Sequence, residues 1–565
     1  MRRLKKGEIT SLVAAGNSAE NWQDILVADS FSVENICGCR FEGRVEIEQG
    51  TVLYNSTISN YHICTGARVE SVLRLECQGP SSFGNGVKVA TVNENGGRSV
   101  VIYDKLTAQT AYVAAMYRHR AEVVEAISAQ ALSYAEGKRS DMGLVGHGAT
   151  IVGAKFVRQT NVGKGVRIEG ASLVCNATLL DGAYVGVDVK ATDFIAAQGS
   201  KIDCGAVVER CFVGENAVVS KGFTAVDSLI FSCSHLENGE ACSLFAGPYT
   251  VSHHKSSLLI AGIFSFFNAG SGTNQSNHLF KSGAIHQAVH RRGCRFGSNG
   301  YVMAPSAEGE FTTVLGRHTR HHDTSALPFS YLVEQNGVSV LLPAFALRSY
   351  GTVRDVEKWQ ARDNRRHCRD IISYQEYNPL LTEKVMQAVA TLRALIAKGG
   401  AEQAEYHYNN VVIKRSAAIY AVTMYEHYIA AAIGAMLSCG SDADSAMNRW
   451  VDLAGQYVDG SLVESLLDRF TTIAAFEHAL RDFEAQYDDA AHGWALTALS
   501  QQLGHTATAA EIEAAIEAGN QSHAFLRSRT TADCQADSGE AMSVGYGIDG
   551  DDEIRLADFR AVQSL

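Results

Sequence analysis

VGKGVRI, residues 162–168, belongs to a set of short segments that repeat one pattern. The other members are VGHGAT (145–150), VGVDVKA (185–191), IDCGAVV (202–208) and VGENAVV (213–219). In each segment an aliphatic residue is followed by Gly or Asp, and a small or β-branched residue stands four places after it. Glycine and Asx residues suit the left-handed backbone of tight corners, and β-branched residues pack well in stacked strands. The pattern therefore predicts short strands joined by corners.

Two periods organise these strands. From Val27 to Leu75, every sixth residue is aliphatic or small. A helix repeats at 3.6 residues and a simple strand at two, whereas a triangular parallel β-helix uses about six residues for each face. A longer period of 17 residues separates Val185, Ile202, Val219 and Leu236, as it does Val145, Val162 and Leu179. One coil is therefore predicted to take about 17 or 18 residues.

The repeated segments resemble hexapeptide-repeat proteins of the left-handed β-helix class. That class includes many acyltransferases, the C-terminal domains of some sugar nucleotidyltransferases, and the γ-class carbonic anhydrases. As a whole, the chain resembles a bacterial family of long hexapeptide-repeat proteins of unknown function, through SGTNQSNHLFKSGAIHQ (271–287) and DTSALPFSYL (323–332). The resemblance implies a left-handed parallel β-helix and a homotrimer in which three such columns pack together.

The six-residue period is interrupted once and then ends. Residues 106–140 are rich in Ala, Glu and other helix formers, which predicts a long helix or a helical hairpin inserted into the coil. After about residue 350 only helical periodicity remains. We expect the first part of the β-helix at 1–105, the insertion at 106–140, the second part at 141–350, an α-helical domain at 351–528 and an acidic tail at 529–565.

Composition narrows the class of protein. The formal charge of -12 argues against a nucleic-acid partner that relies on a global basic field. No apolar run approaches the ~20 residues that cross a bilayer, and the basic start MRRLKKGEIT leads into no apolar signal core. The 13 cysteines are scattered, which fits a reducing compartment. We expect a soluble cytoplasmic protein.

Histidines are concentrated in the later coils, because eight of the 19 fall between His253 and His322. Two pairs, His254 with His290 and His286 with His322, are 36 residues apart. If a coil takes about 18 residues, each pair lies two coils apart on one face, and the imidazoles form a row. Imidazole titrates near neutral pH, so it serves as a general base or, when neutral, as a metal ligand.

Three functions are compatible with this row. The first is an acyltransferase-like transferase with a histidine as general base; the resemblance implies acyl-CoA as a possible co-substrate. The second is a non-catalytic carbohydrate-binding or scaffolding trimer in which the histidines form a polar cluster. The third is a metal site like that of the γ-class anhydrases, although no two of the eight histidines show the five-residue separation of that family, so a metal is left open. The catalytic candidates are His286, His290, His318, His321, His322 and Asp323.

Neighbouring polar residues predict the kind of ligand. Amide side chains offer both donors and acceptors to sugar hydroxyls, although they equally cap the turns of their own loop. Arginine binds phosphate and carboxylate groups through two parallel hydrogen bonds. We therefore predict a sugar or a phosphorylated, nucleotide-sugar-type ligand. The substrate-binding candidates are Asn274, Gln275, Asn277, His278, Lys281, Arg291, Arg317 and Arg320.

Overall fold

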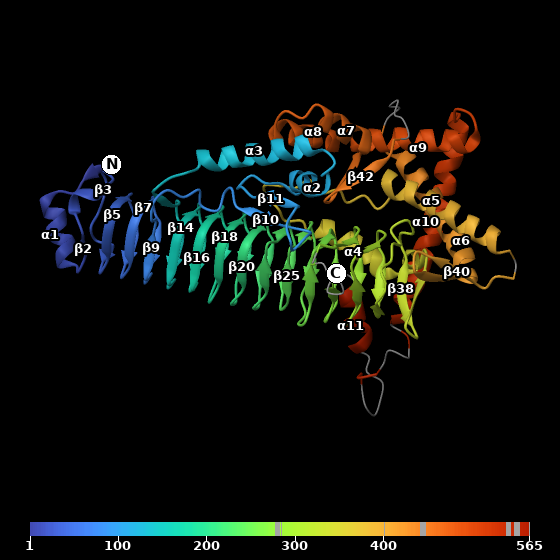
Figure 1. Ribbon diagram of the computed structural model, residues 1–565, viewed down its shortest axis with the longest axis horizontal. Helices are drawn as coiled ribbons and strands as arrows, with labels where there is room; N and C mark the ends of the chain where they lie inside the picture. Colours follow the sequence, from blue (N-terminus) through green and yellow to red (C-terminus); the bar gives the residue numbers. More distant parts are fainter. Residues whose placement is uncertain are drawn as a thin grey trace.

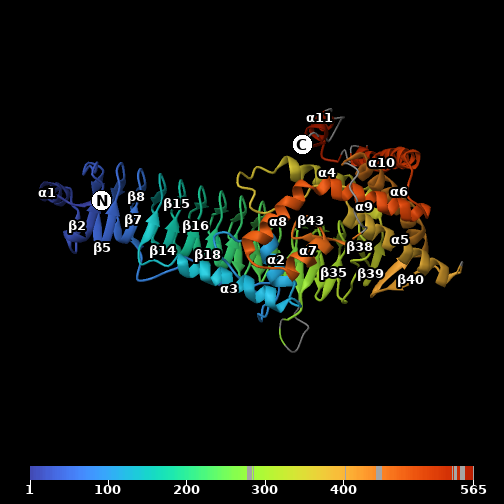
Figure 2. The same cartoon turned by 90° about the horizontal axis from the view of Figure 1, so that it is seen from above.

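The strands of the chain stack into a long column, and most of the helices lie along one side of it (Figure 1). The structure is a computed structural model. It describes residues 1–276, 283, 285–400, 402–440, 448–537, 539, 544–546 and 554–563. Viewed from above, the column runs the length of the molecule, and the C-terminal helices occupy one end (Figure 2).

Each coil of the column contains three short strands. In the coil that starts at Phe156, two of them form β14 (Phe156–Val162), which bends at Gln159, and the third is β15 (Arg167–Glu169). β14 pairs in parallel with β16 (Leu173–Leu179), and β15 pairs in parallel with β17 (Tyr184–Val185). The register places Val162 opposite Leu179, which lies 17 residues later. The predicted period is therefore the length of one coil, and the parallel β-helix is confirmed.

The other strands of the column follow in chain order. Before the insertion they are β1 (Arg2–Arg3), β2 (Ser18–Ala19), β3 (Ile25–Val27), β4 (Ile36–Cys37), β5 (Arg40–Ile47), β6 (Val52–Tyr54), β7 (Thr57–Ile63), β8 (Arg68–Glu70) and β9 (Arg74–Glu76). After it they are β12 (Gly143–Val145), β13 (Thr150–Val152), β18 (Lys190–Ala196), β19 (Lys201–Ile202), β20 (Val207–Val213), β21 (Val218–Ser220), β22 (Thr224–Val226), β23 (Leu229–Ile230), β24 (His235–Glu237), β25 (Glu240–Cys242), β26 (Phe245–Ala246), β27 (Val251–Ser252), β28 (Leu258–Ile260), β29 (Gly262–Phe264), β30 (Asn268–Ala269), β31 (Asn274–Ser276), β32 (Ala288–His290), β33 (Arg295–Phe296), β34 (Tyr301–Met303), β35 (Ser306–Glu308), β36 (Thr313–Leu315), β37 (Arg317–His318), β38 (Tyr331–Gln335) and β39 (Val338–Leu342).

The interior of the column holds the aliphatic residues that define the sequence period. Val185, Ile202, Val219 and Leu236 pair in register on one face, and all four side chains are fully buried. Of the residues counted in sixes from Val27, only Val33 and Thr57 are half-buried, and the others are buried. Stacked burial of this kind is what holds successive coils together.

One corner of each coil has a left-handed backbone. The residues at this corner are Gln159, Asn176, Asp193, Arg210 and Asp227, with φ between 40° and 55°. Asn and Asp adopt this region more readily than most residues. Their side chains also bond along the column, because Asn176 Nδ2 donates to Asp193 Oδ1 at 2.6 Å and Arg210 binds the Asp227 carboxylate in the next coil.

The insertion leaves the column after β9 and returns at β12. It contains the hairpin of β10 (Lys88–Ala90) and β11 (Ser99–Val101), followed by α2 (Ala108–Met116) and α3 (Ala121–Gly137). The insertion therefore begins before residue 106, where we expected it to start, because the residues after β9 add no further coil to the column. The two helices follow one face of the column (Figures 1 and 2).

That face carries apolar side chains on its outer surface. Ile195, Phe212, Leu229, Phe245 and Ile263 occupy successive coils in register and point away from the interior. They are buried in one cluster with apolar residues of α2 and α3. A strand that is apolar on both surfaces needs a cover, and the insertion supplies it.

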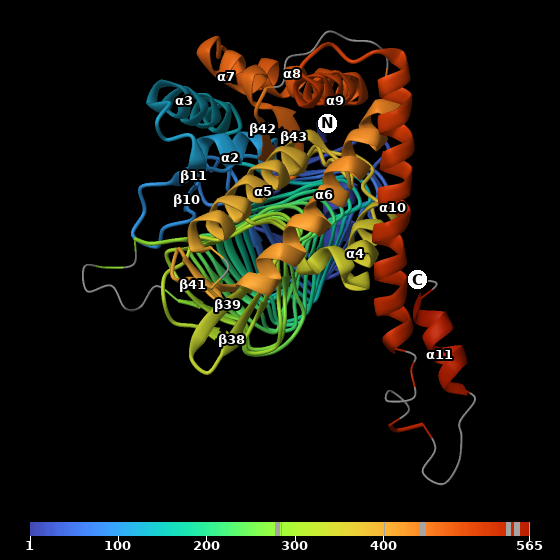
Figure 3. The ribbon, with the colours of Figure 1, turned by 90° about the vertical axis from the view of Figure 1, so that its right-hand side faces the viewer.

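The C-terminal part closes one end of the column (Figure 3) and extends back along it (Figure 1). The hairpin of β40 (Glu405–Tyr408) and β41 (Val411–Lys414) pairs with β39, and β42 (Trp450–Leu453) and β43 (Gln456–Asp459) form a second hairpin. The helices are α4 (Tyr350–Ala361), α5 (Pro379–Gly399), α6 (Arg415–Ser438), α7 (Gly460–Asp468), α8 (Ile473–Ala485), α9 (Tyr487–Leu503), α10 (Ala509–Asp537) and α11 (Ile554–Gln563); α1 (Lys6–Ala14) caps the opposite end.

One detail of the C-terminal part differs from the expected domain boundaries. α10 continues past residue 529, where we expected the acidic tail to begin, because no Gly or Pro occurs between Arg529 and the end of the helix at Asp537. Within the described residues, no helix combines the length and the apolar character needed to cross a membrane.

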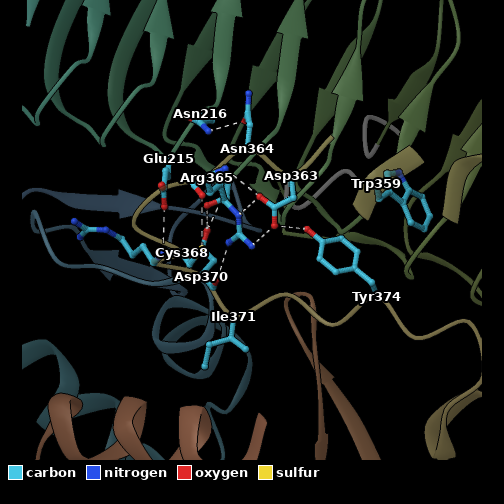
Figure 4. A network of polar contacts seen from close by, with 12 residues as sticks. Glu215, Asn216, Trp359, Asp363, Asn364, Arg365, Cys368, Asp370, Ile371 and Tyr374 are labelled. Carbon is cyan, nitrogen blue, oxygen red and sulfur yellow. Dashed lines mark hydrogen bonds and ion pairs between the residues drawn. The ribbon is translucent and has the colours of Figure 1, made fainter. Parts of the chain in front are cut away.

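A strap at residues 362–374 ties the column to the other two parts (Figure 4). The carboxylate of Glu215, at a corner of the column, accepts backbone N–H groups from Arg366, His367 and Arg369 at 2.8–3.2 Å. Asp370 accepts the Ser232 amide of the column and the Ala108 amide of the insertion. Within the strap, Arg365 binds Asp363 through two hydrogen bonds.

Candidate functional site

The predicted site residues do not form one row, because they occupy three different environments. Some lie inside the column, some lie on its outer surface or corners, and one lines a cavity beside the column. Asn277, His278 and Lys281 lie outside the described residues, so their placement stays a prediction.

The interior group is a buried network centred on Glu308. In β35, Glu308 lies in register with His290 of β32, and its carboxylate binds the Nδ1 atom of His290. The other carboxylate oxygen of Glu308 lies 2.6 Å from His322 Nε2. His290 stacks on Phe264 and Phe267, with ring centroids 5.2 and 5.4 Å away. The histidine and glutamate side chains of this network have no exposed surface.

The charges of the network compensate one another. Burial would raise the pKa of Glu308, but the charge and hydrogen bond of His290 and the contact with His322 lower it to about 2. Burial opposes protonation of His322, yet the hydrogen bond and charge of Glu308 raise its pKa above the usual value. Burial, helped by the charge of His322, lowers the pKa of His318 to about 4. The interior thus holds an ionised Glu308, whose charge favours the protonated form of His322, and a neutral His318.

This arrangement does not suit a general base. A catalytic base must reach a substrate proton, directly or through one water molecule. His290, His318 and His322 are at most 4% exposed, and His318 Nδ1 is already paired with Ser339 Oγ at 2.8 Å. Three of the five histidines predicted as catalytic candidates therefore belong to the core of the column, where His290 and His322 bind Glu308 and His318 binds Ser339.

The coil register also differs from the predicted row of histidines. The neighbours of His290 in the adjacent coils are Phe264 and Glu308, and no histidine stands opposite it. The segment between β31 and β32 lengthens that coil, so a separation of 36 residues is not two coils here. In contrast, His235 and His253 do lie in adjacent coils, with ring centroids 5.8 Å apart.

The outer group consists of separate surface residues. Arg317 covers the ring of Tyr301 at 4.6 Å, Arg320 is exposed, and Asn274 shares the outer ladder of strand residues with Tyr301 and Arg317. His286 is half-buried in the loop before β32.

His321 and Asp323 belong to a corner that the helical part holds in place. Asn410 donates to the backbone oxygen of His321, and Asn409 donates to that of Asp323. The Asp323 carboxylate accepts the amide and hydroxyl of Ser325 at 3.0 and 2.6 Å, which caps its own turn. Gln275, in contrast, points into the column, and the described residues offer neither of its side-chain polar atoms a hydrogen bond.

Arg291 lies in the third environment, a cavity of about 470 Å³ where all three parts of the chain meet. The column contributes Arg291, the insertion contributes two tyrosines, and α5 and β42 close the remaining sides. The lining residues are Tyr112, Tyr117, Arg291, Leu380, Glu383, Lys384, Gln387, Arg449, Trp450, Val451 and Asp452. A cavity of this size with a few convergent polar groups is typical of small-molecule sites.

Positive charge predominates in this cavity. Lys384 forms an ion pair with the buried Glu310, whose other carboxylate oxygen finds no hydrogen-bond partner among the described residues. Burial would raise the pKa of Glu310, but the charges of Lys384 and Arg291 hold it below its usual value. Burial lowers the pKa of Lys384, and the nearby Arg291 acts in the same direction, although the Glu310 charge opposes both.

The acidic residues of the cavity already accept hydrogen bonds from other groups of the protein. Asp452 accepts from Arg292 Nε at 2.9 Å and from the Gly455 amide at 2.6 Å. Glu383 accepts from Gln387 at 3.0 Å, and burial raises the pKa of its carboxyl group. Arg291, although exposed within the cavity, has no hydrogen bond or ion pair from its guanidinium to any residue that the structure describes. An anion entering the cavity would therefore meet the guanidinium of Arg291, which is unpaired within the described residues.

The sequence contains a weak signal for this cavity. Lys384 interrupts the apolar stripe of α5, since it stands at helical spacing from the buried Leu381 and Ala388. A lysine on the buried side of a helix needs a charged partner, which here is Glu310. The partners come from distant segments, so the pattern alone could not assemble them.

Comparisons with known proteins match most of the chain. Residues 50–396 match the family described as "Domain of unknown function (DUF4954)", and residues 432–565 match a second one, "Domain of unknown function (DUF6819)". A relative from Treponema pallidum (strain Nichols), named only as an uncharacterized protein, is 21% identical over 449 residues. That alignment covers 70% of this chain and 62% of the relative, so the chain spans less than two thirds of the relative's length.

Proposed function

We propose that this chain, which belongs to the family described as "Domain of unknown function (DUF4954)", binds a small molecule that carries a phosphate or carboxylate group. The binding site is the cavity between the column, the insertion and α5. The observation that carries the proposal is the guanidinium of Arg291, which faces this cavity without a hydrogen bond or ion pair to the residues that the structure describes.

Charge and geometry support an anionic ligand. Arginine binds planar anions through two parallel hydrogen bonds, and it is less strongly hydrated than lysine. Lys384 and Arg449 line the same cavity and add positive charge, whereas Asp452 is held by Arg292. A bound phosphate would offset the positive charge that the carboxylates of the cavity do not neutralise.

The cavity walls favour a ligand with a sugar or ring attached to the anion. Tyr112, Tyr117 and Trp450 contribute aromatic rings, and Gln387 contributes an amide. Aromatic rings stack on the apolar faces of sugars and bases, and amides bond to hydroxyl groups. A sugar phosphate or a nucleotide sugar combines these features, in agreement with the ligand class predicted from the sequence.

A transferase is the second candidate function. It is favoured by Lys384, because burial lowers the pKa of this amine and brings it closer to the range in which lysine accepts a proton. The base would then be Lys384 in place of the buried histidines, with acyl-CoA as a possible donor. A non-catalytic binding or scaffolding protein would use the same cavity without turnover.

The experiment is a binding titration with inorganic phosphate, sugar phosphates, nucleotide sugars and coenzyme A, followed by calorimetry. Arg291→Gln should weaken binding at least about tenfold, since hydrogen bonds to charged groups contribute about 1.5–3 kcal/mol. Arg320→Gln is the matched control, because this arginine is exposed outside the cavity. Equal affinity in wild type and Arg291→Gln would contradict the proposal.

Two further measurements separate the alternatives. Mass spectrometry of reactions containing acyl-CoA and the bound sugar detects transfer, and Lys384→Met should abolish it. Thermal unfolding of this variant monitors its fold, because the substitution leaves the buried Glu310 without its ion-pair partner. Light scattering of the purified chain tests the homotrimer that the sequence resemblance implies, since it distinguishes the mass of one chain from that of three.

A further inference from the structure

A second cluster of chemically active side chains lies in the first coils, at the other end of the column from α5 and β42 (Figure 1). It consists of Glu46 in β5, Glu48 directly after β5, His62 in β7 and Cys64 directly after β7. The two strands pair in parallel, with Glu46 opposite His62 and Ile47 opposite Ile63. This register brings Glu48 beside Cys64 one coil later.

We propose that Glu48, His62 and Cys64 bind a divalent metal ion of the zinc class. One ligand atom from each residue lies within 4.8 Å of the others, and His62 Nε2 lies 3.0 Å from Glu48 Oε1. Zinc bonds of about 2.0–2.3 Å in tetrahedral geometry place ligand atoms roughly 3.3–3.5 Å apart. Small side-chain rotations would therefore close this set around an ion.

The types of ligand narrow the choice of metal. A thiolate combined with an imidazole and a carboxylate suits zinc, whereas magnesium and calcium prefer oxygen ligands alone. Three protein ligands leave one tetrahedral position for water or another small ligand, as in catalytic zinc sites.

An outer layer of hydrogen bonds orients two of the ligands. His62 Nδ1 faces Glu46 Oε2 at 3.2 Å, which directs the opposite ring nitrogen, Nε2, toward Glu48 and the site. Glu48 Oε2 accepts both the amide and the hydroxyl of Thr65 at 2.7 Å, which leaves Oε1 for the ion. Metal-binding histidines and carboxylates are commonly oriented in this way, and such partners strengthen metal affinity. This layer is independent of the ligand cluster itself and points to the same site.

The site is open to solvent on one side. The side chains of His62 and Glu48 keep 32% and 25% of their surface exposed, whereas Cys64 is buried at 6%. An ion can therefore enter past the imidazole and carboxylate and reach the thiol behind them. When the ion binds, the thiol proton and any proton on His62 Nε2 are released to solvent.

The test is titration of chelator-treated protein with Zn²⁺ and with Co²⁺ as a spectroscopic probe. We expect one ion per chain and a cobalt spectrum with a thiolate charge-transfer band. Cys64→Ser should remove that band, and His62→Ala should weaken zinc binding at least tenfold. Cys37→Ser is the matched control, because this exposed cysteine lies outside the cluster and should leave the spectrum unchanged.

A second variant keeps the inference testable if a ligand substitution disturbs folding. Glu46→Gln retains all three ligands, and loss of its charge beside His62 should weaken zinc binding about 10- to 100-fold. Thermal unfolding monitors the fold of each variant. A stoichiometry near zero, a cobalt band that survives in Cys64→Ser, or unchanged affinity in Glu46→Gln would each overturn the metal site. None of these results depends on the anion cavity.

Discussion

At the scale of single residues, the buried histidines make the stability of the column depend on pH. His318 has a pKa lowered to about 4 by burial and by the charge of His322, against about 6.5 in an unfolded chain. Between pH 6.5 and 4 the unfolded chain binds a proton that the folded chain does not. Stability is therefore complete above pH 6.5 and falls as the pH drops through this window, by about 3 kcal/mol.

We predict that His318→Gln reduces this acid sensitivity. Glutamine retains a polar group near Ser339 but cannot titrate. Urea unfolding at a series of pH values should show a shallower loss of stability between pH 6.5 and 4 in the variant than in wild type. The raised pKa of His322 acts in the opposite direction, because its contribution is present below pH 6.5 and is lost as the pH rises through the folded value. Parallel pH profiles for the two proteins would contradict the prediction.

At the scale of elements, the sequence period predicted the column because burial in its interior selects the residue type at each repeated position. Val162 and Leu179 are aliphatic because they share one narrow interior, and that requirement repeats in every coil. The covered face was predictable in the same way. Phe212 and Phe245 lie in apolar runs that do not alternate, CFV and LFA, and such runs indicate strands buried on both surfaces.

The site residues were less predictable, because their neighbours depend on loop lengths. The segment between β31 and β32 shifts His290 out of the 17-residue period, so its neighbour in the preceding coil is Phe264, and the next coil presents Glu308. The strap could not be predicted from the sequence, for a similar reason. The basic residues of VRDVEKWQARDNRRHCRD are spaced as on one helix, but α4 ends at Ala361 and Arg365 then binds Asp363 in a loop.

The prediction at the scale of elements concerns the stability of the close crossing between α6 and α10. α6 and α10 meet at Gly434 and Gly519, where a Cβ atom added to either residue would lie 2.8 Å from the Cα atom of the other. Gly434→Ala or Gly519→Ala should therefore destabilise the protein by about 1–3 kcal/mol, despite the better helix propensity of alanine. The control is Gly137→Ala in α3, where an added Cβ meets nothing within 4 Å. Urea midpoints measure all three, and a stable Gly434→Ala variant would show that the crossing can relax.

At the scale of the whole molecule, the column is protected unevenly along its length. A solenoid is stabilised mainly by contacts between neighbouring coils, so distant parts can unfold separately. The later coils are also held by the insertion and the helical part. Phe245 contacts Tyr112 of α2, and Arg292 is buried between Phe266 and Tyr457 with its Nε atom on Asp452. The coils of β5 and β7 lie beyond α2 and α3 and lack this cover (Figure 1).

We therefore predict two unfolding events. In hydrogen exchange with increasing denaturant, amides of β5 and β7 should exchange at lower denaturant than those of β26 and β29. Phe245→Ala should lower protection of the later coils by about 3–5 kcal/mol, because it opens a cavity under α2, and should leave β5 and β7 unchanged. Phe41→Ala, in β5, is the matched control. It should lower the protection of β5 and β7 and leave the later coils unchanged, since its buried ring lies in the coils that α2 and α3 do not cover. If both substitutions lowered protection equally along the column, the chain would unfold as one unit and the helices would stabilise every coil.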